Sequence, residues 1–331
     1  MTPDRVRWGI LATGWVAGRF TEDLRLLDEC EVVAVGSRTL AAAEAFASRH
    51  DIPRAYGSWA ALAADPDVDV VYVATPHAAH RQAALTCIDA GKAVLVEKPV
   101  TLDAGSAQEL VTAARRRGTF LMEAMWMRCL PVVRRVARLI ADGAIGAVTS
   151  VRADFGLPGP FDPAHRLRDP ALGGGATLDL GIYPVTLAHL ALGMPDTVQA
   201  VATRTPEGVD ENTGILLGYP SGAVATLSCG FVGETPCTAA ISGTLGRIDL
   251  PSPFYRPDRF TLHGTGAAPA VVEEPIRGWG YHFEAAEVNR CLRAGLGESP
   301  LVPASTSVAV LSILDQIRAR IGVTYPGQVG P

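Results

Sequence analysis

The 331-residue chain has few charges for its length and no excess of basic residues. Charged residues make up 19 % of the sequence, and the formal net charge is −5. A protein that wraps nucleic acid needs a basic surface to neutralise phosphates, so this composition argues against nucleic-acid binding. The hydrophobic share of 48 % supports a sizeable folded core, and the length suits two domains.

Paired cysteines and long apolar runs are also missing. The six cysteines show neither a C-x-x-C pair nor zinc-finger spacing, and we interpret them as reduced thiols of a cytoplasmic protein. No apolar stretch reaches the roughly 18–20 residues of a membrane span. The apolar run near the N-terminus is interrupted by Gly14 and Gly18, so we expect a first strand and its loop there instead of a signal peptide.

The first half of the sequence alternates apolar runs with helix-forming segments. Strands are expected over 6–11, 31–38, 68–77, 93–99 and 119–125, and helices over 21–27, 40–50, 79–91 and 103–118. Near-continuous apolar strands that are each followed by a helix indicate a parallel sheet covered on both faces. The fold class is therefore α/β in this part of the chain.

The second half has a different pattern. A helix is expected over 132–143, and short strand-like runs separated by Gly, Pro and Asp turns follow it. Sequential short strands of this kind indicate a largely antiparallel sheet. Apolar residues at helical spacing predict a last helix over 308–322.

Polar and loop-forming residues stand where the expected parallel strands end. They are Ala12-Thr13-Gly14, Ser37-Arg38, Thr75-Pro76-His77, Glu97-Lys98-Pro99 and Glu123. Parallel sheets bind ligands beyond the carboxyl ends of their strands, so these residues predict a ligand-binding edge. A ligand-binding edge would explain why the charged Lys98 stands at the end of an apolar strand, which burial alone does not explain.

The loop after the first strand approximates the dinucleotide motif G-x-G-x-x-G. Residues 12–17 read Ala12-Thr13-Gly14-Trp15-Val16-Ala17, and Gly14 would let the backbone approach a pyrophosphate at the N-terminus of the following helix. Ala12 departs from the glycine that usually makes the tight turn. On this loop alone, an ordinary strand-to-helix turn is the alternative.

The end of the second strand bears on which nucleotide would bind. An NAD site usually has Asp or Glu there for the ribose hydroxyls. Here the strand ends in Gly36-Ser37-Arg38 without a carboxylate. A hydroxyl beside a guanidinium suits a 2′-phosphate, so we predict NADP in preference to NAD. The alternative is a solvent-exposed arginine without a ligand.

Several segments resemble the Gfo/Idh/MocA oxidoreductases in the same order along nearly the whole chain. They are GILATGWVA, GSR, VATPHAAH, EKPVTL and GGGATLDLGIYP. LMEAMWMRCLPVV and LGGGATLDLGIYPV are similar to the branch with dimeric dihydrodiol dehydrogenase and NADP-dependent xylose dehydrogenase. The resemblance implies a Rossmann NADP-binding domain over 1–123. It also implies an α+β substrate-binding domain over 124–331 with an open, mainly antiparallel sheet. We expect the final helix 308–322 to pack back on the N-terminal domain and the sheet to form a homodimer.

The resemblance also implies roles for three residues. Lys98 would be the catalytic lysine of the EKP motif, next to a cis Pro99. Tyr183 would be the general acid/base, and Asp179, four residues earlier on the same helical face, would orient the substrate hydroxyl. A cationic lysine stabilises a developing alkoxide and lowers a neighbour's pKa, which a tyrosine with an intrinsic pKa near ~10 needs. A capping Asp179 and a core Tyr183 are the alternative.

The expected binding residues fall into two sets. Cofactor contacts are expected from Thr13, Gly14, Trp15, Val16, Ser37, Arg38, Thr75, Pro76, His77, His80, Glu97 and Lys98. Aromatic faces suit sugar rings and cyclic diols, and substrate contacts are expected from Trp126, Arg152, Phe155, Arg166, Asp179, Tyr183 and Tyr281. His77 and His80 have the spacing of a metal pair, but no carboxylate or cysteine is near them in the sequence, so we expect no metal site.

The leading hypothesis is an NADP-dependent dehydrogenase. It would transfer a hydride between nicotinamide and a secondary alcohol of a small sugar or cyclic diol, such as an aldose C1 or a trans-dihydrodiol. One alternative is a ketoreductase of a nucleotide-linked sugar, which is disfavoured because EAMWMRCLP after the fifth strand contains no histidine. Another is a non-catalytic regulator that senses NADP and sugar, which the presence of Lys98 and Tyr183 disfavours.

Overall fold

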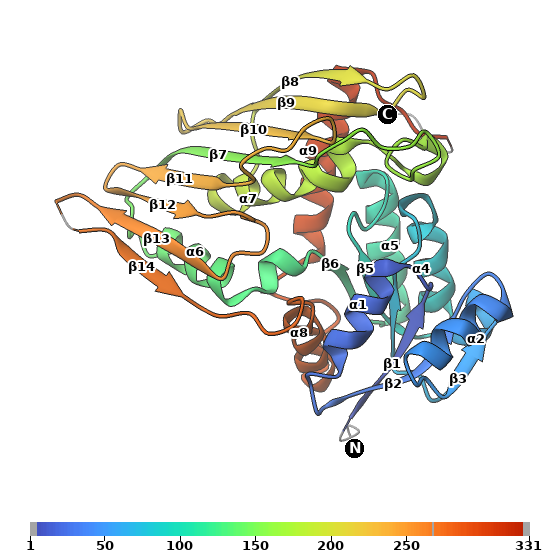
Figure 1. The fold of residues 1–331 in the computed structure, drawn as a ribbon. Helices are drawn as coiled ribbons and strands as arrows, with labels where there is room; N and C mark the ends of the chain where they lie inside the picture. The colour runs from blue at the N-terminus through green and yellow to red at the C-terminus, as the bar shows by residue number, and fades with distance from the viewer. Residues whose placement is uncertain (1–4, 267, 327–331) are drawn as a thin grey trace. The chain divides into compact units, whose positions relative to one another are not determined.

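The structure is a computed structural model that describes residues 5–266 and 268–326. The chain divides into two units (Figure 1). The first unit consists of residues up to 101 together with 105–129 and 276–308, and the second consists of 102–104, 130–275 and the residues from 309 onward. The predicted domains differ from this division, because they placed 276–308 in the C-terminal part. The packing of the last helix on the N-terminal domain stays a prediction.

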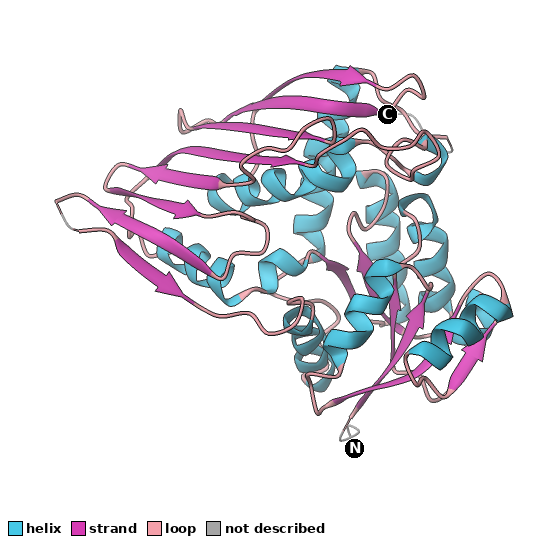
Figure 2. Cartoon of the chain, in the orientation of Figure 1, coloured by secondary structure: helices cyan, strands magenta, loops and turns pink. Residues whose placement is uncertain are grey.

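A parallel six-stranded sheet forms the centre of the first unit (Figure 2). Its strand order is β3-β2-β1-β4-β5-β6, in which the direction of winding reverses between β1 and β4, as in dinucleotide-binding folds. The strands are β1 Val6–Leu11, β2 Cys30–Gly36, β3 Arg54–Tyr56, β4 Val70–Val73, β5 Ala93–Glu97 and β6 Leu121–Ala124. The helices are α1 Trp15–Leu24, α2 Leu40–Arg49, α3 Trp59–Ala63, η1 His77–Ala79, α4 His80–Asp89, α5 Ala104–Arg117, η2 Trp126–Cys129 and α8 His282–Arg293. The predicted Rossmann fold is confirmed.

An eight-stranded sheet forms the second unit, in the order β14-β13-β12-β11-β7-β10-β9-β8. All neighbouring strands are antiparallel except β7 and β10, which confirms the predicted mainly antiparallel sheet. The strands are β7 Val148–Gly156, β8 Thr197–Arg204, β9 Asp210–Gly218, β10 Val224–Gly230, β11 Ala239–Gly243, β12 Gly246–Leu250, β13 Arg259–Gly264 and β14 Ala270–Glu273. The helices are α6 Pro131–Ala141, η3 Pro170–Leu172, the π-helix η4 Thr177–Gly181, α7 Ile182–Leu192 and α9 Ala304–Ile321, which begins in the first unit.

Each face of the second sheet has its own composition. Alternate strand residues such as Val151, Ile215 and Leu227 are buried on the face against which α7 packs. The intervening residues, among them Leu216 and Val224, are exposed on the opposite face. This alternation follows from the two-residue period of a strand.

The first helix begins earlier than predicted, and several strands and helices were missed. α1 starts at Trp15, not at residue 21, because Gly18 is accommodated inside it. Apart from the short 3₁₀ and π-helical turns, the missed elements are β3, β14, α3, α7 and α8. β3 has three residues and α3 has five, which is too short for a periodic pattern. α7 is apolar nearly all round and therefore shows no helical alternation.

The segment before α8 belongs to the first unit because α1 binds it. The buried Asp23 carboxylate of α1 accepts hydrogen bonds from the backbone N–H groups of Trp279, at 2.9 and 3.0 Å, and Tyr281, at 2.8 Å. α8 then packs against α1. No sequence pattern pairs a single aspartate with a backbone segment more than 250 residues away.

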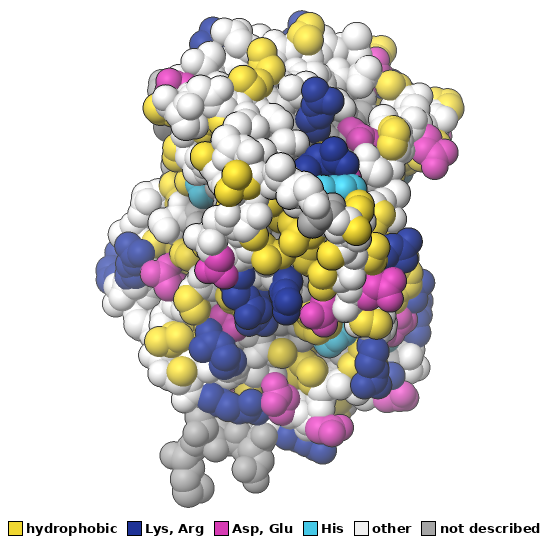
Figure 3. Space-filling view, turned by 90° about the vertical axis from the view of Figure 1, so that its left-hand side faces the viewer, with side chains coloured by type: hydrophobic (Ala, Val, Ile, Leu, Met, Phe, Trp, Pro, Cys, Tyr) yellow, Lys and Arg dark blue, Asp and Glu magenta, His cyan; other side chains and the backbone are white. Residues whose placement is uncertain are grey.

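None of the helices in the described part of the chain combines the length and apolar character that a membrane span requires. On the face that Figure 3 shows, basic and acidic side chains are scattered among apolar ones.

Ala12 has a backbone conformation that favours glycine. Its φ is 113°, and its N–H donates to the Gly36 carbonyl at 2.9 Å, so the turn is fixed to the end of β2. A non-glycine residue in such a region is strained by about 1–3 kcal/mol. The departure from the dinucleotide motif therefore has a conformational cost, while the turn itself is formed.

We predict that Ala12→Gly raises the free energy of unfolding by about 1 kcal/mol, because relief of strain exceeds the added entropy of the unfolded chain. Urea titration followed by tryptophan fluorescence measures the change. Ala17→Gly, inside α1, is the control and should lower stability by about 1 kcal/mol. Equal losses in both variants would show that Ala12 is unstrained.

Candidate active site

The β1–α1 loop has the features of an anion site. Gly14 precedes α1 with φ −77° and ψ 178°, and no protein atom lies within 4 Å of a β-carbon built on it. Neither backbone geometry nor neighbouring atoms of the chain therefore require glycine here. The first turn of the ten-residue α1 also lacks a side-chain cap. Uncapped N–H groups beside an open glycine fit the close approach of a phosphate.

The end of β2 presents a hydroxyl and a guanidinium. The Ser37 N–H donates to the Tyr56 carbonyl at 3.0 Å, which fixes the strand end against β3. Arg38 is exposed and forms no ion pair with another described residue. Its charge is thus available to an anionic ligand at this edge.

The end of β4 is held by a buried histidine. His80 Nε2 lies 2.7 Å from the Thr75 carbonyl oxygen, and His80 Nδ1 lies 2.7 Å from the Pro99 carbonyl oxygen. Burial lowers the pKa of His80 to about 3, against the opposing effect of these two carbonyls. The ring therefore links the loop after β4 to the turn after β5. The Thr75 hydroxyl is buried without a partner among the described residues, which leaves a hydrogen-bonding group for a ligand.

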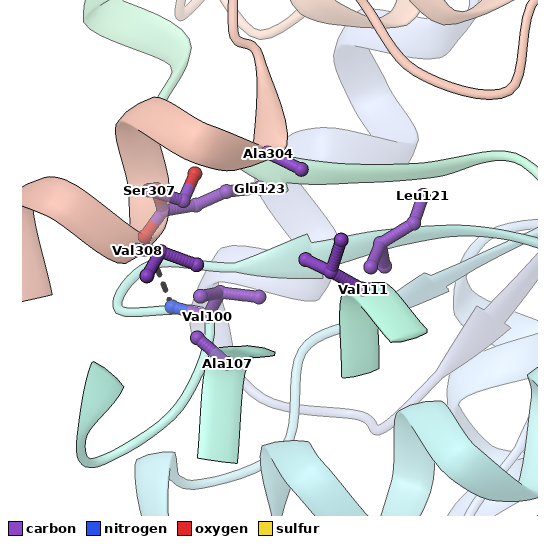
Figure 4. A pocket seen from close by; sticks show the side chains of 8 residues that line it. All are labelled: Val100, Ala107, Val111, Leu121, Glu123, Ala304, Ser307 and Val308. Carbon is purple, nitrogen blue, oxygen red and sulfur yellow. Dashed lines mark hydrogen bonds between the residues drawn. The ribbon is translucent and has the colours of Figure 1, made fainter. Parts of the chain in front are cut away.

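Lys98 lies in a turn that buried acids hold. The Lys98–Pro99 bond is cis, as predicted. The Glu97 carboxylate accepts the hydroxyl hydrogen of Tyr72 and the N–H of Lys98, the latter at 3.1 Å. Glu123 at the end of β6 accepts the N–H of Val100 at 3.0 Å (Figure 4). The backbone on both sides of Lys98 is thereby fixed.

A small cavity lies beside Glu123. Its volume is about 10 Å³, and Ser307 and apolar side chains line it (Figure 4). The volume suffices for roughly one water molecule. This cavity is too small for a substrate.

Glu284 of α8 is a fully buried acid near the same turn. Both carboxyl oxygens have no hydrogen-bond partner among the described residues. Burial raises its pKa well above the usual range, and the neighbouring Glu97, Asp23 and Glu123 add to the effect. Burial therefore favours the protonated, neutral form of Glu284.

In the second unit, Asp179 and Tyr183 occupy consecutive helical segments. Asp179 lies in the π-helix η4, and Tyr183 lies in the first turn of α7. Arg166 donates to the nearly buried Asp179 carboxylate at 2.9 Å. Two of the predicted substrate residues are thus paired, and the half-exposed arginine leaves part of this pair accessible.

Aromatic rings surround Tyr183. Phe155 lies 5.7 Å from it between ring centroids, and Tyr255 lies 5.2 Å away. Tyr255 also stacks on Phe155 at 4.4 Å with an interplanar angle of 12°. Tyr255 was not predicted from the sequence. The turn Pro251-Ser252-Pro253, which is followed by two aromatic residues, could have indicated an aromatic side chain at the site.

A buried aspartate fixes the start of η4. Asp210 accepts hydrogen bonds from the Thr177 N–H at 2.8 Å, the Thr177 hydroxyl at 2.6 Å and the Thr213 hydroxyl at 2.8 Å. Tyr325 donates its hydroxyl hydrogen to the Gly174 carbonyl. These bonds fix the glycine run and the helix that carries Asp179.

Arg152 and Phe155 lie on different faces of the second sheet. Arg152 is three positions before Phe155 in β7, so the two side chains point to opposite faces. Arg152 is exposed in a hollow of about 540 Å³ that Asp154, Asp249 and Arg259 also line. Its assignment to the substrate pocket stays a prediction.

The remaining predicted residues lie in the first unit. Trp126 and Tyr281 contact each other with ring centroids 5.0 Å apart. Thr13 and Pro76 lie in the loops after β1 and β4, while Val16 lies in the first turn of α1 and His77 begins η1. Among the residues the structure describes, no group of three or more His, Cys, Asp or Glu side chains is arranged to hold a metal ion.

Comparison with known proteins agrees with this geometry. The model of an oxidoreductase family with an NAD-binding Rossmann fold matches residues 6–125, and the Gfo/Idh/MocA C-terminal domain model matches residues 133–249. The chain belongs to the Gfo/Idh/MocA family. It is therefore an NAD(P)-dependent oxidoreductase, and the predicted dehydrogenase class is confirmed.

Individual relatives cover nearly the whole chain. A bovine protein named trans-1,2-dihydrobenzene-1,2-diol dehydrogenase is 40 % identical over 331 residues, with 97 % of this chain and 98 % of that protein covered. The 3-ketoreductase KijD10 from Actinomadura kijaniata, solved with NADP and TDP-benzene, has a TM-score of 0.83 at 29 % identity, with 96 % and 98 % covered. An aldose-aldose oxidoreductase from Caulobacter crescentus, complexed with glycerol, has a TM-score of 0.85 at 25 % identity, with 96 % and 97 % covered.

We predict that Glu284→Gln stabilises the protein at neutral pH. Above the ordinary carboxyl pKa of about 4.3, the unfolded chain ionises Glu284 while the fold keeps it protonated, so wild-type stability falls as pH rises. The variant has no such loss. Its advantage should grow between pH 5 and 8, by at most about 1.4 kcal/mol per pH unit. Urea unfolding across this range measures it.

Glu287→Gln on the same helix is the matched control. Glu287 bonds Arg290 at 2.8 Å and accepts the Ser299 hydroxyl hydrogen. Burial opposes ionisation, but these donors lower the pKa of Glu287 overall. The control should thus be less stable than wild type at neutral pH and lose this deficit as pH falls through the lowered pKa. A pH-independent effect of Glu284→Gln would contradict the neutral acid.

Proposed function

We propose that the protein is an NADP-dependent dehydrogenase of a secondary alcohol in a sugar or cyclic diol. The observation that carries this proposal is the group around Tyr183. A phenol hydroxyl, the flat faces of Phe155 and Tyr255, and the Arg166–Asp179 pair lie together in one unit. Flat rings suit a cyclic substrate, and the charged pair suits its hydroxyl groups. The bovine relative's name supports a dihydrodiol, and the bacterial aldose oxidoreductase supports a sugar.

The first unit has groups that fit the dinucleotide. The uncapped start of α1 and the open Gly14 would bind the pyrophosphate. Ser37 and Arg38 would bind a 2′-phosphate, and the unpartnered Thr75 hydroxyl would bind a ribose or nicotinamide group. Glu97 and His80 also hold the turn through buried contacts, and their predicted contacts with the cofactor stay a prediction.

In the proposed reaction, Tyr183 accepts the substrate hydroxyl proton during oxidation and returns it during reduction. Lys98 stabilises the anionic forms of the alcohol oxygen and the phenol. Asp179, paired with Arg166, orients the hydroxyl by accepting its hydrogen bond. When bound, the dinucleotide supplies the hydride acceptor or donor. Oxidation thus removes one hydride, which passes to the dinucleotide, and one proton, which passes to Tyr183.

A second candidate is reduction of a nucleotide-linked sugar. The 3-ketoreductase structure with TDP-benzene favours it through similarity of fold over 96 % of the chain. The dihydrodiol dehydrogenase relative is more similar in sequence, at 40 % against 29 % identity. Activity with thymidine-diphosphate sugars but not with free sugars or diols would select this candidate.

We also propose a homodimer through the open face of the second sheet. Val201, Leu216 and Val271 are exposed on this face at 74 %, 47 % and 59 %. The hollow beside them contains both arginines and aspartates. Two copies of this surface related by a two-fold axis could therefore pair opposite charges. An apolar face of this kind is typical of an interface.

We expect NADPH to bind more tightly than NADH, and Arg38→Ala to reduce that preference at least ~10-fold, or about 1.4 kcal/mol. The substitution removes the guanidinium that is proposed to bind the 2′-phosphate, a group that NADH lacks. Titration of each nucleotide by tryptophan quenching measures the ratio. Arg116→Ala, an exposed arginine on α5, should leave it unchanged. An unchanged ratio in Arg38→Ala would place the 2′-phosphate elsewhere.

We expect Tyr183→Phe to lower kcat by about 10²–10⁴ while the NADPH affinity stays the same, since only the proton-carrying hydroxyl is removed. Steady-state assays with trans-dihydrodiols and aldoses measure the effect. Tyr255→Phe removes a hydroxyl from the same aromatic group and should change kcat little. Lys98→Met should lower kcat as well. Similar kcat losses in both tyrosine variants would argue against a proton-transfer role for Tyr183.

Sedimentation velocity of the full chain should give a dimer of the 34.8 kDa protomer, and Leu216→Arg should shift it to monomer, because a charge would be buried in the proposed interface. Leu245→Arg, at an exposed turn of the same unit, is the control. A wild-type monomer at micromolar concentration would exclude this dimer.

A further inference from the structure

The segment that follows α9, residues 322–326, is packed into the second unit although it forms no helix or strand. Val323 and Tyr325 are both buried. The Val323 N–H donates to the Arg318 carbonyl of α9 at 3.1 Å, so the segment is tied to the end of that helix. The proposed reaction does not use this segment, and its contacts lead to the glycine run before η4.

Tyr325 is held at both ends of its side chain. The Arg318 guanidinium carbon lies 5.0 Å from the centroid of its ring, and Asp315 on the same helix accepts a hydrogen bond from that arginine. At the other end, the Tyr325 hydroxyl donates to the Gly174 carbonyl. The ring is therefore supported by α9, and its hydroxyl is directed at the glycine run.

The phenol keeps its hydrogen. Burial raises the pKa of Tyr325, and the neighbouring carboxylates of Asp210 and Asp179 raise it further against the opposing charge of Arg318. Tyr325 is thus a permanent hydrogen-bond donor, which stands beside two acids of the candidate site.

The glycine run is closely packed around this bond. Gly175 has a φ of 109°, and a β-carbon built on it would lie 2.5 Å from Asp210 Oδ1 and 3.1 Å from the Tyr325 hydroxyl oxygen. A β-carbon on Gly174 would lie 2.7 Å from the Leu167 carbonyl oxygen. The run is therefore in close contact with Tyr325 and Asp210, and also with the segment that carries Arg166.

The run joins the two halves of the Arg166–Asp179 pair. The Gly175 N–H donates to the Leu167 carbonyl at 2.8 Å, which fixes the residue next to Arg166. Asp179 follows the run by four residues, in η4. The 2.9 Å contact between the Arg166 guanidinium and the Asp179 carboxylate thus depends on the position of the glycines between them.

We propose that Tyr325 is a positioning residue for substrate binding, because its hydrogen bond holds the glycine run where Arg166 and Asp179 pair. The proposal rests on the proposed function, in which this pair binds the substrate hydroxyl groups. Tyr325 acts through the run and is not itself a catalytic residue. The segment after α9 therefore contributes to the affinity for substrate.

The test is a steady-state assay of the full chain with trans-1,2-dihydrobenzene-1,2-diol and with aldoses. Tyr325→Phe keeps the buried ring and removes only the hydroxyl. It should raise KM about fivefold, the loss expected from one hydrogen bond, and change kcat less than about twofold, since Tyr183 keeps its aromatic neighbours. Partial unfolding would instead lower kcat in proportion to the lost protein and leave KM unchanged.

Tyr219→Phe is the matched control. Tyr219 is a buried tyrosine of the same unit, and its hydroxyl has no hydrogen-bond partner among the described residues. This variant should keep the wild-type KM. In an Arg166→Gln background, Tyr325→Phe should change KM less than about twofold, because the pair through which it acts is already broken.

Hydrogen exchange followed by mass spectrometry measures the glycine run directly. The amides of Gly174 and Gly175 should exchange about fivefold faster in Tyr325→Phe than in wild type, while the amides of β10 keep their rates. Tyr219→Phe should match wild type at both places.

The outcomes separate the two proposals. An active wild type with a KM in Tyr325→Phe within about twofold of its own would overturn the positioning role and leave the proposed function standing. A full KM effect of Tyr325→Phe in the Arg166→Gln background would do the same. Absence of wild-type activity with diols, aldoses and nucleotide-linked sugars would overturn both proposals.

Discussion

The turn that carries Lys98 depends on buried hydrogen bonds from three neighbouring parts of the first sheet. Tyr72 of β4 holds Glu97, Glu123 of β6 holds the N–H after Pro99, and His80 contacts the Pro99 carbonyl. A buried polar group left without its partner is destabilising by about 1–3 kcal/mol, so each contact strongly favours this one conformation. The sheet thereby positions a flexible lysine at the strand end through its backbone.

The second unit uses the same principle with a different element. Asp210 fixes the start of a π-helix through two threonines, and this helix carries Asp179. A π-helix is rare and is found mostly at functional sites, because its irregular backbone needs outside support. Here the support is a buried carboxylate, as it is for the segment before α8 that Asp23 binds in the first unit. Both units thus place their reactive or exposed side chains by fixing backbone next to them.

The features that follow from local sequence patterns were predictable, whereas those that depend on contacts between residues far apart in the sequence were not. The strand ends at Ser37, Thr75 and Lys98 were predictable, since a parallel sheet brings the ends of apolar runs to one edge. Tyr255 was not, because its loop joins the site only after β7 and β11 pair across more than 80 residues. Arg152 and Phe155 could have been assigned to different faces from the sequence, because a strand alternates its faces and the two residues are an odd number of positions apart. The position of Trp279 depends on Asp23, and a single distant aspartate leaves no pattern in the sequence.

Two buried acids on neighbouring helices of the first unit differ in their hydrogen-bond donors. Burial raises the pKa of Asp23, but His282 and the backbone N–H groups of Trp279 and Tyr281 lower it overall. Glu284 has no donor among the described residues, and burial raises its pKa well above the usual range. Donor supply, not burial alone, thus separates the ionised acid from the neutral one on neighbouring helices. A second ionised carboxylate at Glu284 would repel Glu97 and weaken the hold on the Lys98 turn. Protonation of the acid on α8 therefore removes a charge repulsion beside the Glu97 carboxylate that holds the turn.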